Sequence, residues 1–243
     1  MTSELHKLEG AGNDFLLGIG PWAQRLDGEP DLVRRLCDRR RGIGADGTLA
    51  VEAVRDDRVR LGYRNADGSR GDFCANGTRC AARAAVELLG CEPKLAVETG
   101  WAEIAAEVVG SQVSLELPPP QSTPQRHEVA DPEGIRNGFL LKIGVPHLVI
   151  ETAELADLDL PAIAPPLRHN ASLGPAGANI DFYEVETGGV LNVRTWERGV
   201  EGETLSCGSG VVAVALVVMA DRGSDRVELA PLSGDRLVVE ALG

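Results

Sequence analysis

Two short peptides in this sequence resemble each other, and each begins with a cysteine. Cys74-Ala75-Asn76-Gly77 precedes an alanine-rich run, and Cys207-Gly208-Ser209-Gly210 precedes a valine-rich run 133 residues further on. Each peptide predicts a thiol just before the first turn of a helix, and a helix that is apolar nearly all round must be buried. Two such sites indicate a duplicated fold whose two thiols face one pocket.

A proline-rich segment divides the chain almost in half. Four of the seven residues 118–124 are prolines, which are excluded from the interior of a sheet and suit an extended linker. We therefore expect an N-terminal lobe at residues 1–118 that carries Cys74, a linker at 119–124, and a C-terminal lobe at 125–243 that carries Cys207.

Hydrophobic periodicity and turn residues predict a similar plan for both halves. The expected strands of the first half are residues 5–8, 48–54, 58–64, 95–99, 102–109 and 113–117, with helices at 31–40 and 78–89. Those of the second half are residues 139–143, 148–151, 180–186, 190–195, 226–229 and 236–239, with a helix at 209–221. The predicted fold class is α+β: two pseudo-symmetric lobes, each a mostly antiparallel sheet wrapped around a central hydrophobic helix.

A helix N-terminus gives a thiol particular chemistry. The macrodipole and the free N–H groups of the first turn lower the pKa of such a thiol from about 8.5 toward neutrality, and they can bind a carboxylate. The small residues Ala75 and Gly208 let a ligand approach the backbone closely. Asn76 and Ser209 are expected to cap the two helices.

A thiolate and a thiol on opposite sides of one carbon are the groups that racemisation requires. The thiolate removes the α-proton and the thiol returns a proton to the other face, which is general acid–base catalysis. The chain has only three lysines, Lys7, Lys94 and Lys142, and none lies in a recognisable pyridoxal motif. We therefore expect an enzyme that acts on a small-molecule amino acid and uses neither cofactor nor metal.

Composition and cysteine usage exclude several other classes of protein. A net charge of -13 argues against a nucleic-acid partner, because phosphate contacts need clustered Lys and Arg. The apolar run 211–220 is too short for a membrane span, which needs about 20 residues. Five cysteines without a CxxC pair indicate reduced thiols and a cytoplasmic protein. Among them, Cys37, Cys80 and Cys91 are expected to be buried packing residues.

Eight blocks along nearly the whole chain resemble the diaminopimelate epimerase family. They are residues 6–15 (HKLEGAGNDF), 41–47 (RGIGADG), 65–69 (NADGS), 74–80 (CANGTRC), 144–147 (GVPH), 177–182 (GANIDF), 196–199 (WERG) and 203–210 (ETLSCGSG). The resemblance implies two lobes that close on the substrate, a homodimer, and cofactor-independent interconversion of LL- and meso-2,6-diaminopimelate for lysine and peptidoglycan synthesis.

The resemblance also implies roles for individual residues. Cys74 and Cys207 are the acid–base pair, and His147 and Glu197 tune the two thiols. The distal amino acid group of the substrate is bound by Asn13, Asn65 and Asn179. The reacting carboxylate is held by Asn76, Gly77, Ser209 and Gly210 with their neighbours Ala75 and Gly208, and Glu197 and Arg198 meet the ammonium and carboxylate of the substrate.

This chain departs from the family pattern at a few positions. The family often has Gln at Gly47, Asn at Val145 and Gly at Ala75. Gly47 and Val145 are substrate-side positions, so we expect fewer hydrogen bonds to the distal group. The chain also ends, at Gly243, earlier than the resemblance leads us to expect, which predicts the lack of a final strand and a weaker dimer.

Two other functions stay open. A racemase of proline, hydroxyproline or another amino acid would use the same fold and paired thiols, and a non-catalytic amino-acid-binding protein would need neither thiol. Individual residues also have structural alternatives. Asn13, Asn65 and Asn179 suit turns, His147 suits a buried core position, and Glu197 with Arg198 suits a surface ion pair.

Overall fold

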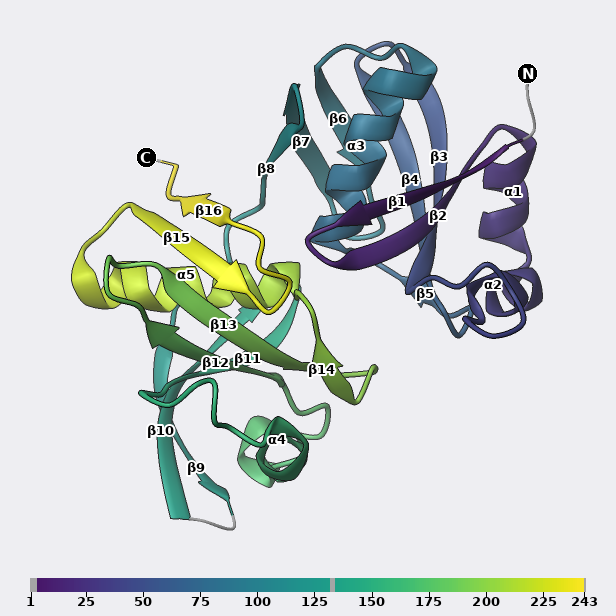
Figure 1. Ribbon diagram of the computed structural model, residues 1–243. Coiled ribbons are helices and arrows are strands. Elements are labelled where there is room, and N and C mark those ends of the chain that lie inside the picture. Colours follow the sequence, from purple (N-terminus) through teal and green to yellow (C-terminus); the bar gives the residue numbers. More distant parts are fainter. Residues whose placement is uncertain (1–3, 132–133, 243) are drawn as a thin grey trace. The chain divides into compact units, whose positions relative to one another are not determined.

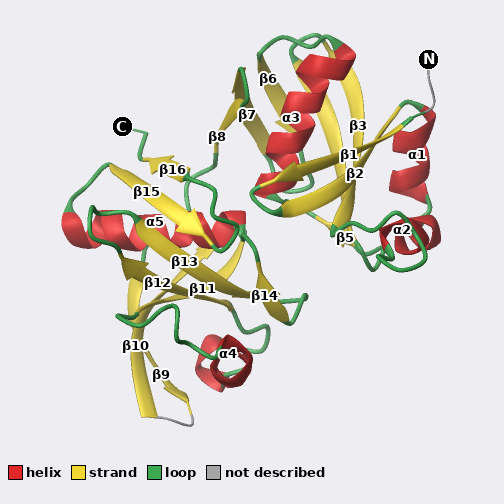
Figure 2. Cartoon of the chain, viewed as in Figure 1, coloured by secondary structure: helices red, strands yellow, loops and turns green. Residues whose placement is uncertain are grey.

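The computed structural model describes residues 4–131 and 134–242. The chain separates into two compact units, Met1–Pro118 and Pro119–Gly243. Each unit is one sheet with its own helices (Figure 1). The prediction of an α+β fold, with a sheet around a hydrophobic helix in each half, is confirmed (Figure 2).

Unit 1 is an eight-stranded sheet of order β1-β2-β3-β4-β6-β7-β8, with β5 paired to β4. The β2–β3 and β4–β6 pairs are parallel and the other pairs are antiparallel. Its strands are β1 Leu5–Gly10, β2 Asn13–Ile19, β3 Gly47–Arg55, β4 Arg58–Asn65, β5 Arg70–Gly71, β6 Lys94–Glu98, β7 Glu103–Val109 and β8 Gln112–Glu116. Its helices are α1 Pro21–Gly28, α2 Pro30–Cys37 and α3 Ala75–Leu89.

Helices cover both faces of the unit 1 sheet, and the alternation of side chains along each strand decides which residues meet which helix. Phe15, Leu17, Leu49 and Val51 pack with the alanines of α3 in one core cluster. Their neighbours Leu16 and Ala50 instead pack with Ala23 and Leu26 of α1 and Val33 of α2. The helix α3 is therefore enclosed by its sheet, as the alanine-rich run predicts.

Unit 2 is also an eight-stranded sheet, of order β16-β15-β13-β12-β11-β10-β9, with β14 paired to β13. The β11–β12 and β13–β15 pairs are parallel and the others antiparallel. Its strands are β9 Gln125–Asp131, β10 Gly134–Ile143, β11 Val145–Glu151, β12 Asn179–Val185, β13 Leu191–Glu197, β14 Gly202–Thr204, β15 Arg226–Pro231 and β16 Leu237–Glu240. Its helices are α4 Leu160–Arg168, the short 3-10 helix Ala171–Leu173, and α5 Gly208–Arg222.

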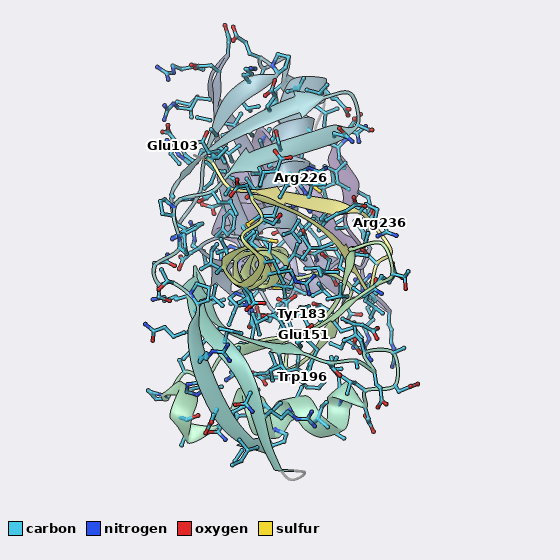
Figure 3. The ribbon with its side chains drawn as sticks, turned by 90° about the vertical axis from the view of Figure 1, so that its left-hand side faces the viewer. Glu103, Glu151, Tyr183, Trp196, Arg226 and Arg236 are labelled. Carbon is cyan, nitrogen blue, oxygen red and sulfur yellow. The ribbon has the colours of Figure 1, made fainter. Side chains whose placement is uncertain are left out.

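The two faces of the unit 2 sheet carry different helices (Figure 1). Trp196, Ile180 and Phe182 pack with Leu160 and Leu167 of α4 on one side, and Figure 3 shows Trp196 close to that helix. The other side faces α5, whose valines and alanines are buried along most of its length. Tyr183 donates to Glu151 over 3.1 Å, which ties β12 to β11 (Figure 3).

The two units share one topology. In each, an antiparallel hairpin leads through a helical connection to a parallel strand, then to an antiparallel strand, a short paired strand, the buried helix and a second parallel strand. The sequence β1-β2-β3-β4-β5-α3-β6-β7 of unit 1 therefore matches β10-β11-β12-β13-β14-α5-β15-β16 of unit 2. A duplicated arrangement of strands thus accompanies the duplicated cysteine peptides.

Several predicted boundaries are wrong. The helix expected at residues 31–40 spans Pro30–Cys37, because Pro30 is accepted in its first turn. Sequence patterns do not predict the helices α1 and α4 or the strands β2, β5, β9 and β14. Residues 119–124 have no regular structure, and Gln121 and Ser122 bond to the end of β10 and the turn after it.

Candidate active site

Both cysteines occupy the position immediately before the first turn of a buried helix. Cys74 is the N-cap residue of α3, with extended backbone, and its sulfur accepts the Gly77 N–H at 3.4 Å. Cys207 is the N-cap residue of α5 in a similar conformation. The expectation that Asn76 and Ser209 cap these helices is wrong, because both lie inside the first turn.

In unit 1, the side chain of Asn13 lies beside Cys74. The Cys74 thiol donates to Asn13 Oδ1 over 3.6 Å, and Asn13 Nδ2 donates to Asp46 Oδ2 over 2.8 Å. A carboxylate only accepts hydrogen bonds, so Asp46 fixes the amide of Asn13 with its nitrogen toward Asp46 and its oxygen toward Cys74. This contact requires the protonated form of Cys74.

A charged network holds Asp46 in place. Arg39 bonds both Asp14, at 2.7 Å, and Asp46, at 2.6 Å, and Lys7 pairs with Asp14 at 2.7 Å. Burial acts to raise the pKa of Asp14, but the bonds from Arg39, Lys7 and the Asp46 N–H outweigh it and hold that pKa well below its usual range. Arg39 and the reciprocal backbone bonds between Asp14 and Asp46 therefore hold Asp46 beside Asn13.

Asn65 and Gly47 face each other across β3 and β4. Asn65 accepts from Tyr63 Oη at 2.6 Å and donates to Ser69 Oγ at 3.0 Å, so its bonds lie within its own turn. A Cβ atom at Gly47 would meet the carbonyl oxygen of Arg64 at 2.5 Å. A longer residue therefore does not fit at position 47 without a shift of the backbone.

In unit 2, three neighbours surround the sulfur of Cys207. Asn179 Nδ2 donates to it over 3.7 Å, Ser209 Oγ lies 3.5 Å away, and Glu197 is hydrogen-bonded to it. Asn179 Oδ1 accepts the Arg198 N–H at 2.8 Å, which fixes the orientation of this amide. Asn179 therefore presents its nitrogen to Cys207, whereas Asn13 presents its oxygen to Cys74.

The electrostatics of Cys207 differ from the sequence-based expectation. Burial raises the pKa of Cys207 well above its ordinary value, and the negative charges of Glu197 and Asp181 raise it further, although Ser209 and the Gly210 N–H act in the opposite direction. Burial also raises the pKa of Glu197, against a bond from Thr204 at 2.5 Å. The predicted lowering by the helix N-terminus is outweighed here, and Cys207 rests as a thiol.

His147 is fully buried in unit 2, beside Asp181, which the sequence patterns do not single out. Its Nδ1 lies 2.7 Å from Asp181 Oδ2, and Thr195 donates to Asp181 Oδ1 over 2.8 Å. The signal that could have found Asp181 is an acidic residue between the apolar Ile180 and Phe182 of a buried strand. An aspartate in such a place must be paired if it is buried.

Arg198 follows the end of β13, and the loop after it is held by the buried Arg168. Arg168 bonds Glu201 at 2.9 Å and the carbonyl oxygen of Ala176 at 2.9 Å. Glu201 in turn accepts the Gly199 N–H at 3.1 Å. Among the described residues no ion pair joins Glu197 to Arg198, and Glu197 instead bonds to Thr204 and Cys207.

Comparison with known proteins identifies the family. The family model described as diaminopimelate epimerase matches residues 6–120 and 139–241. A diaminopimelate epimerase of Chlorobaculum tepidum is 37% identical over 238 residues, covering 96% of this chain and 90% of the relative. One from Archaeoglobus fulgidus is 38% identical over 226 residues, covering 87% and 79%.

The chain belongs to the diaminopimelate epimerase family. The resemblance seen in the sequence is therefore confirmed. The prediction that the chain is an isomerase is confirmed with it.

Solved structures with the same fold have lower sequence identity to this chain than the diaminopimelate epimerases do. A putative phenazine biosynthesis PhzC/PhzF protein from Clostridium difficile has a TM-score of 0.74 at 13% identity, covering 100% of this chain and 92% of its own. A hydroxyproline epimerase from Agrobacterium vitis, with bound trans-4-hydroxy-L-proline, has a TM-score of 0.69 at 16% identity, covering 98% and 82%. These likenesses show the fold.

The remaining cysteines of this family member are packing residues. Burial raises the pKa of Cys80 to about 12 and that of Cys37 to about 11, and Cys91 is buried as well. Such thiols stay protonated and unreactive at neutral pH. Within the part of the chain that the structure describes, no helix combines the length and apolarity that crossing a membrane requires.

Proposed function

We propose that this protein epimerises LL-2,6-diaminopimelate to the meso form without a cofactor, by acid–base catalysis with two cysteines. The observation that carries the proposal is that Cys74 and Cys207 occupy the same N-cap position in two units of the same topology. Membership of the family supports the substrate.

In the proposed mechanism, both cysteines act on one α-carbon. One, as the thiolate, removes the α-proton, and the other, as the thiol, returns a proton to the opposite face, so the two exchange protonation states. Cys74 donates a hydrogen bond as a thiol, and the pKa of Cys207 is raised. Binding of the positively charged substrate ammonium is therefore needed to favour the thiolate form of one cysteine. The negative charge of the carbanion-like state is then stabilised by preorganised N–H groups.

The substrate-binding residues form two groups in the proposal. The first turns of α3 and α5 would hold the reacting carboxylate through Ala75, Asn76 and Gly77 and through Gly208, Ser209 and Gly210, since N–H groups of a first turn lack partners within the helix. Asn13, Asn65, Asn179, Glu197 and Arg198 would bind the amino and distal groups, and His147 and Glu197 would tune the thiols. The resemblance supports a homodimer and a cytoplasmic location as further parts of the proposal.

The test is proton NMR of LL-diaminopimelate in D₂O with the purified protein alone. We expect loss of the α-proton signal together with formation of the meso isomer. Cys74→Ala and Cys207→Ala should each lower the rate by roughly 10²–10⁴-fold, the usual contribution of a general acid or base. Cys91→Ala is the matched control, because that buried thiol follows the end of α3 opposite to Cys74.

Other outcomes would replace the proposal. Exchange with proline or hydroxyproline, and none with diaminopimelate, would favour the racemase alternative. Binding of an amino acid without exchange would favour the non-catalytic protein. Near wild-type turnover by either cysteine variant would contradict the two-base mechanism.

A further inference from the structure

Besides Asn179, three polar side chains are buried on the face of the unit 2 sheet that meets the start of α5. They are His147 on β11, Asp181 on β12 and Thr195 on β13, each 2% exposed or less. Asp181 lies directly opposite Thr195 in the strand register, and a Cβ atom at Gly210 would collide with Asp181 Oδ1. The three residues therefore lie under the first turn of α5, beside Gly210, which follows Cys207 by three positions.

The matching positions of unit 1 are apolar or aromatic. Leu49 lies opposite Tyr63 in register, and Phe15 pairs with Gly47 as His147 pairs with Asn179. A Cβ atom at Gly77 would meet Leu49 at 2.9 Å and Phe15 at 3.5 Å. Phe15, Leu49 and Tyr63 are thus the counterparts of His147, Asp181 and Thr195.

This comparison shows that the fold does not need polar groups at these positions. Burying a polar group is costly unless it is hydrogen-bonded, and burying a charge costs more. Unit 1 builds the same strands and helix around Phe15 and Leu49. The buried polar residues of unit 2 therefore indicate a functional role around Cys207. We call Cys207 and the side chains around it the Cys207 half-site.

The hydrogen bonds define the state of the imidazole. The Asp181 carboxylate accepts from Thr195 at one oxygen and lies 2.7 Å from His147 Nδ1 at the other, so Nδ1 is the donor. His147 Nε2 is buried and has no hydrogen-bond partner among the described residues. A lone pair left unpaired there is less costly than the N–H of a charged imidazolium.

We propose that Asp181 is a positioning residue that holds His147 as the Nδ1–H tautomer, leaving Nε2 as a proton acceptor in the Cys207 half-site. Uptake of one proton at Nε2 gives an imidazolium whose charge the Asp181 carboxylate balances. The inference rests on the proposed function for its role, since the proton would come from a thiol of the acid–base pair and leave a thiolate. Asp181 itself is not a group that touches the substrate.

Few other ionisable groups face this imidazole. On the same side of the sheet, β13 contributes Glu197 and the start of α5 contributes Cys207. The β10 residue opposite His147 is the apolar Leu141, and the first charged residue of α5 is Asp221, near its far end. Arg194 and Glu203 pair with each other, at 2.6 Å, and Arg194 bonds to carbonyl groups beside α4. Only a few ionisable neighbours can therefore influence the protonation of the His147 imidazole.

The test is ¹⁵N–¹H NMR of the full chain labelled at histidine, which reads the tautomer without requiring activity. The chain has four histidines, and only His147 is fully buried, so His147→Gln assigns its signals. We expect a neutral Nδ1–H ring near pH 7. An Nε2–H tautomer or an imidazolium at that pH would overturn the proposal.

Asp181→Asn tests the positioning role, because an amide can bond either ring tautomer. We expect a mixture of tautomers, and a fall in kcat of about 10–100-fold with KM little changed, the usual effect of losing such a partner. Asp221→Asn, on the same unit, is the control. An unchanged tautomer in folded Asp181→Asn would contradict the proposal, whether or not the wild type turns over diaminopimelate.

Discussion

Asp46 shows how one carboxylate can govern the environment of a thiol that it does not touch. Asp46 accepts a hydrogen bond from the amide nitrogen of Asn13, so Asn13 Oδ1 points toward Cys74. Arg39 and the Asp14 N–H hold the carboxylate in turn. The orientation of Asn13 therefore depends on a residue outside its own strand.

Replacement of Asp46 tests this dependence. In Asp46→Ala, Asn13 loses its acceptor and its amide is free to rotate, so we expect kcat/KM to fall about tenfold, or about 1.4 kcal/mol. Asp46→Asn keeps an acceptor oxygen and should retain more activity than Asp46→Ala. Asp57→Ala, which breaks only a surface pair with Arg55, serves as the control. Equal rates for Asp46→Ala and this control would show that the Asn13 orientation is unimportant.

The sequence predicts the cysteines better than their partners. A thiol before a small residue and an apolar helix is a local pattern, so Cys74 and Cys207 are found from neighbours in the chain. Asp181 is brought under α5 only by the pairing of β12 with β13, and Asp46 meets Asn13 only through the parallel pairing of β2 and β3. Such long-range register is not encoded in any short window.

The helices α3 and α5 each approach their sheet through a glycine in the first turn. At Gly77 the nearest obstacle is the terminal methyl group of Leu49, which can move, whereas at Gly210 it is the buried carboxylate of Asp181. The two glycines therefore have the same place in the fold but different tolerance for a side chain.

Alanine at each position tests this difference. We expect Gly210→Ala to lower the free energy of unfolding by about 1–3 kcal/mol, as overpacking of a core usually does. Gly77→Ala should cost less, because Leu49 can adopt another rotamer. Urea unfolding of the two variants provides the measurement and each is the other's control. A larger loss for Gly77→Ala would contradict the packing described here.

The elements missed from the sequence are those whose local signals conflict with their structure. The helix α4 contains Pro165 and Pro166, which usually end a helix, yet Leu160, Ile163 and Leu167 bury its inner face. In α1 only Ala23 and Leu26 are buried, so its periodicity is weak. Packing against the sheet stabilises both helices where local preference does not.

Each unit encloses its own apolar core. Leu17 belongs to the cluster around α3 and Leu167 to the cluster under α4, and both side chains are fully buried. Residues 119–124, at the start of unit 2, have no regular secondary structure. We propose that the two units are separate domains that unfold independently.

Calorimetry of the full chain tests this independence. Leu17→Ala and Leu167→Ala should each remove about 2–5 kcal/mol from the unit that contains the substitution. We expect two transitions, of which each variant lowers one. A single transition that both variants shift equally would mean that the units unfold together.

The divergence of the two thiol environments has a kinetic consequence. No enzyme alters the equilibrium between the two isomers of its substrate. The difference between Phe15 and Leu49 in unit 1 and their counterparts His147 and Asp181 in unit 2 therefore cannot change the equilibrium ratio of the isomers. Under the proposed mechanism, forward and reverse turnover start from opposite protonation states of the pair. Because these two states hold the same number of protons, kcat/KM has one pH optimum in both directions, and unequal surroundings instead give the two isomers different values of kcat and KM.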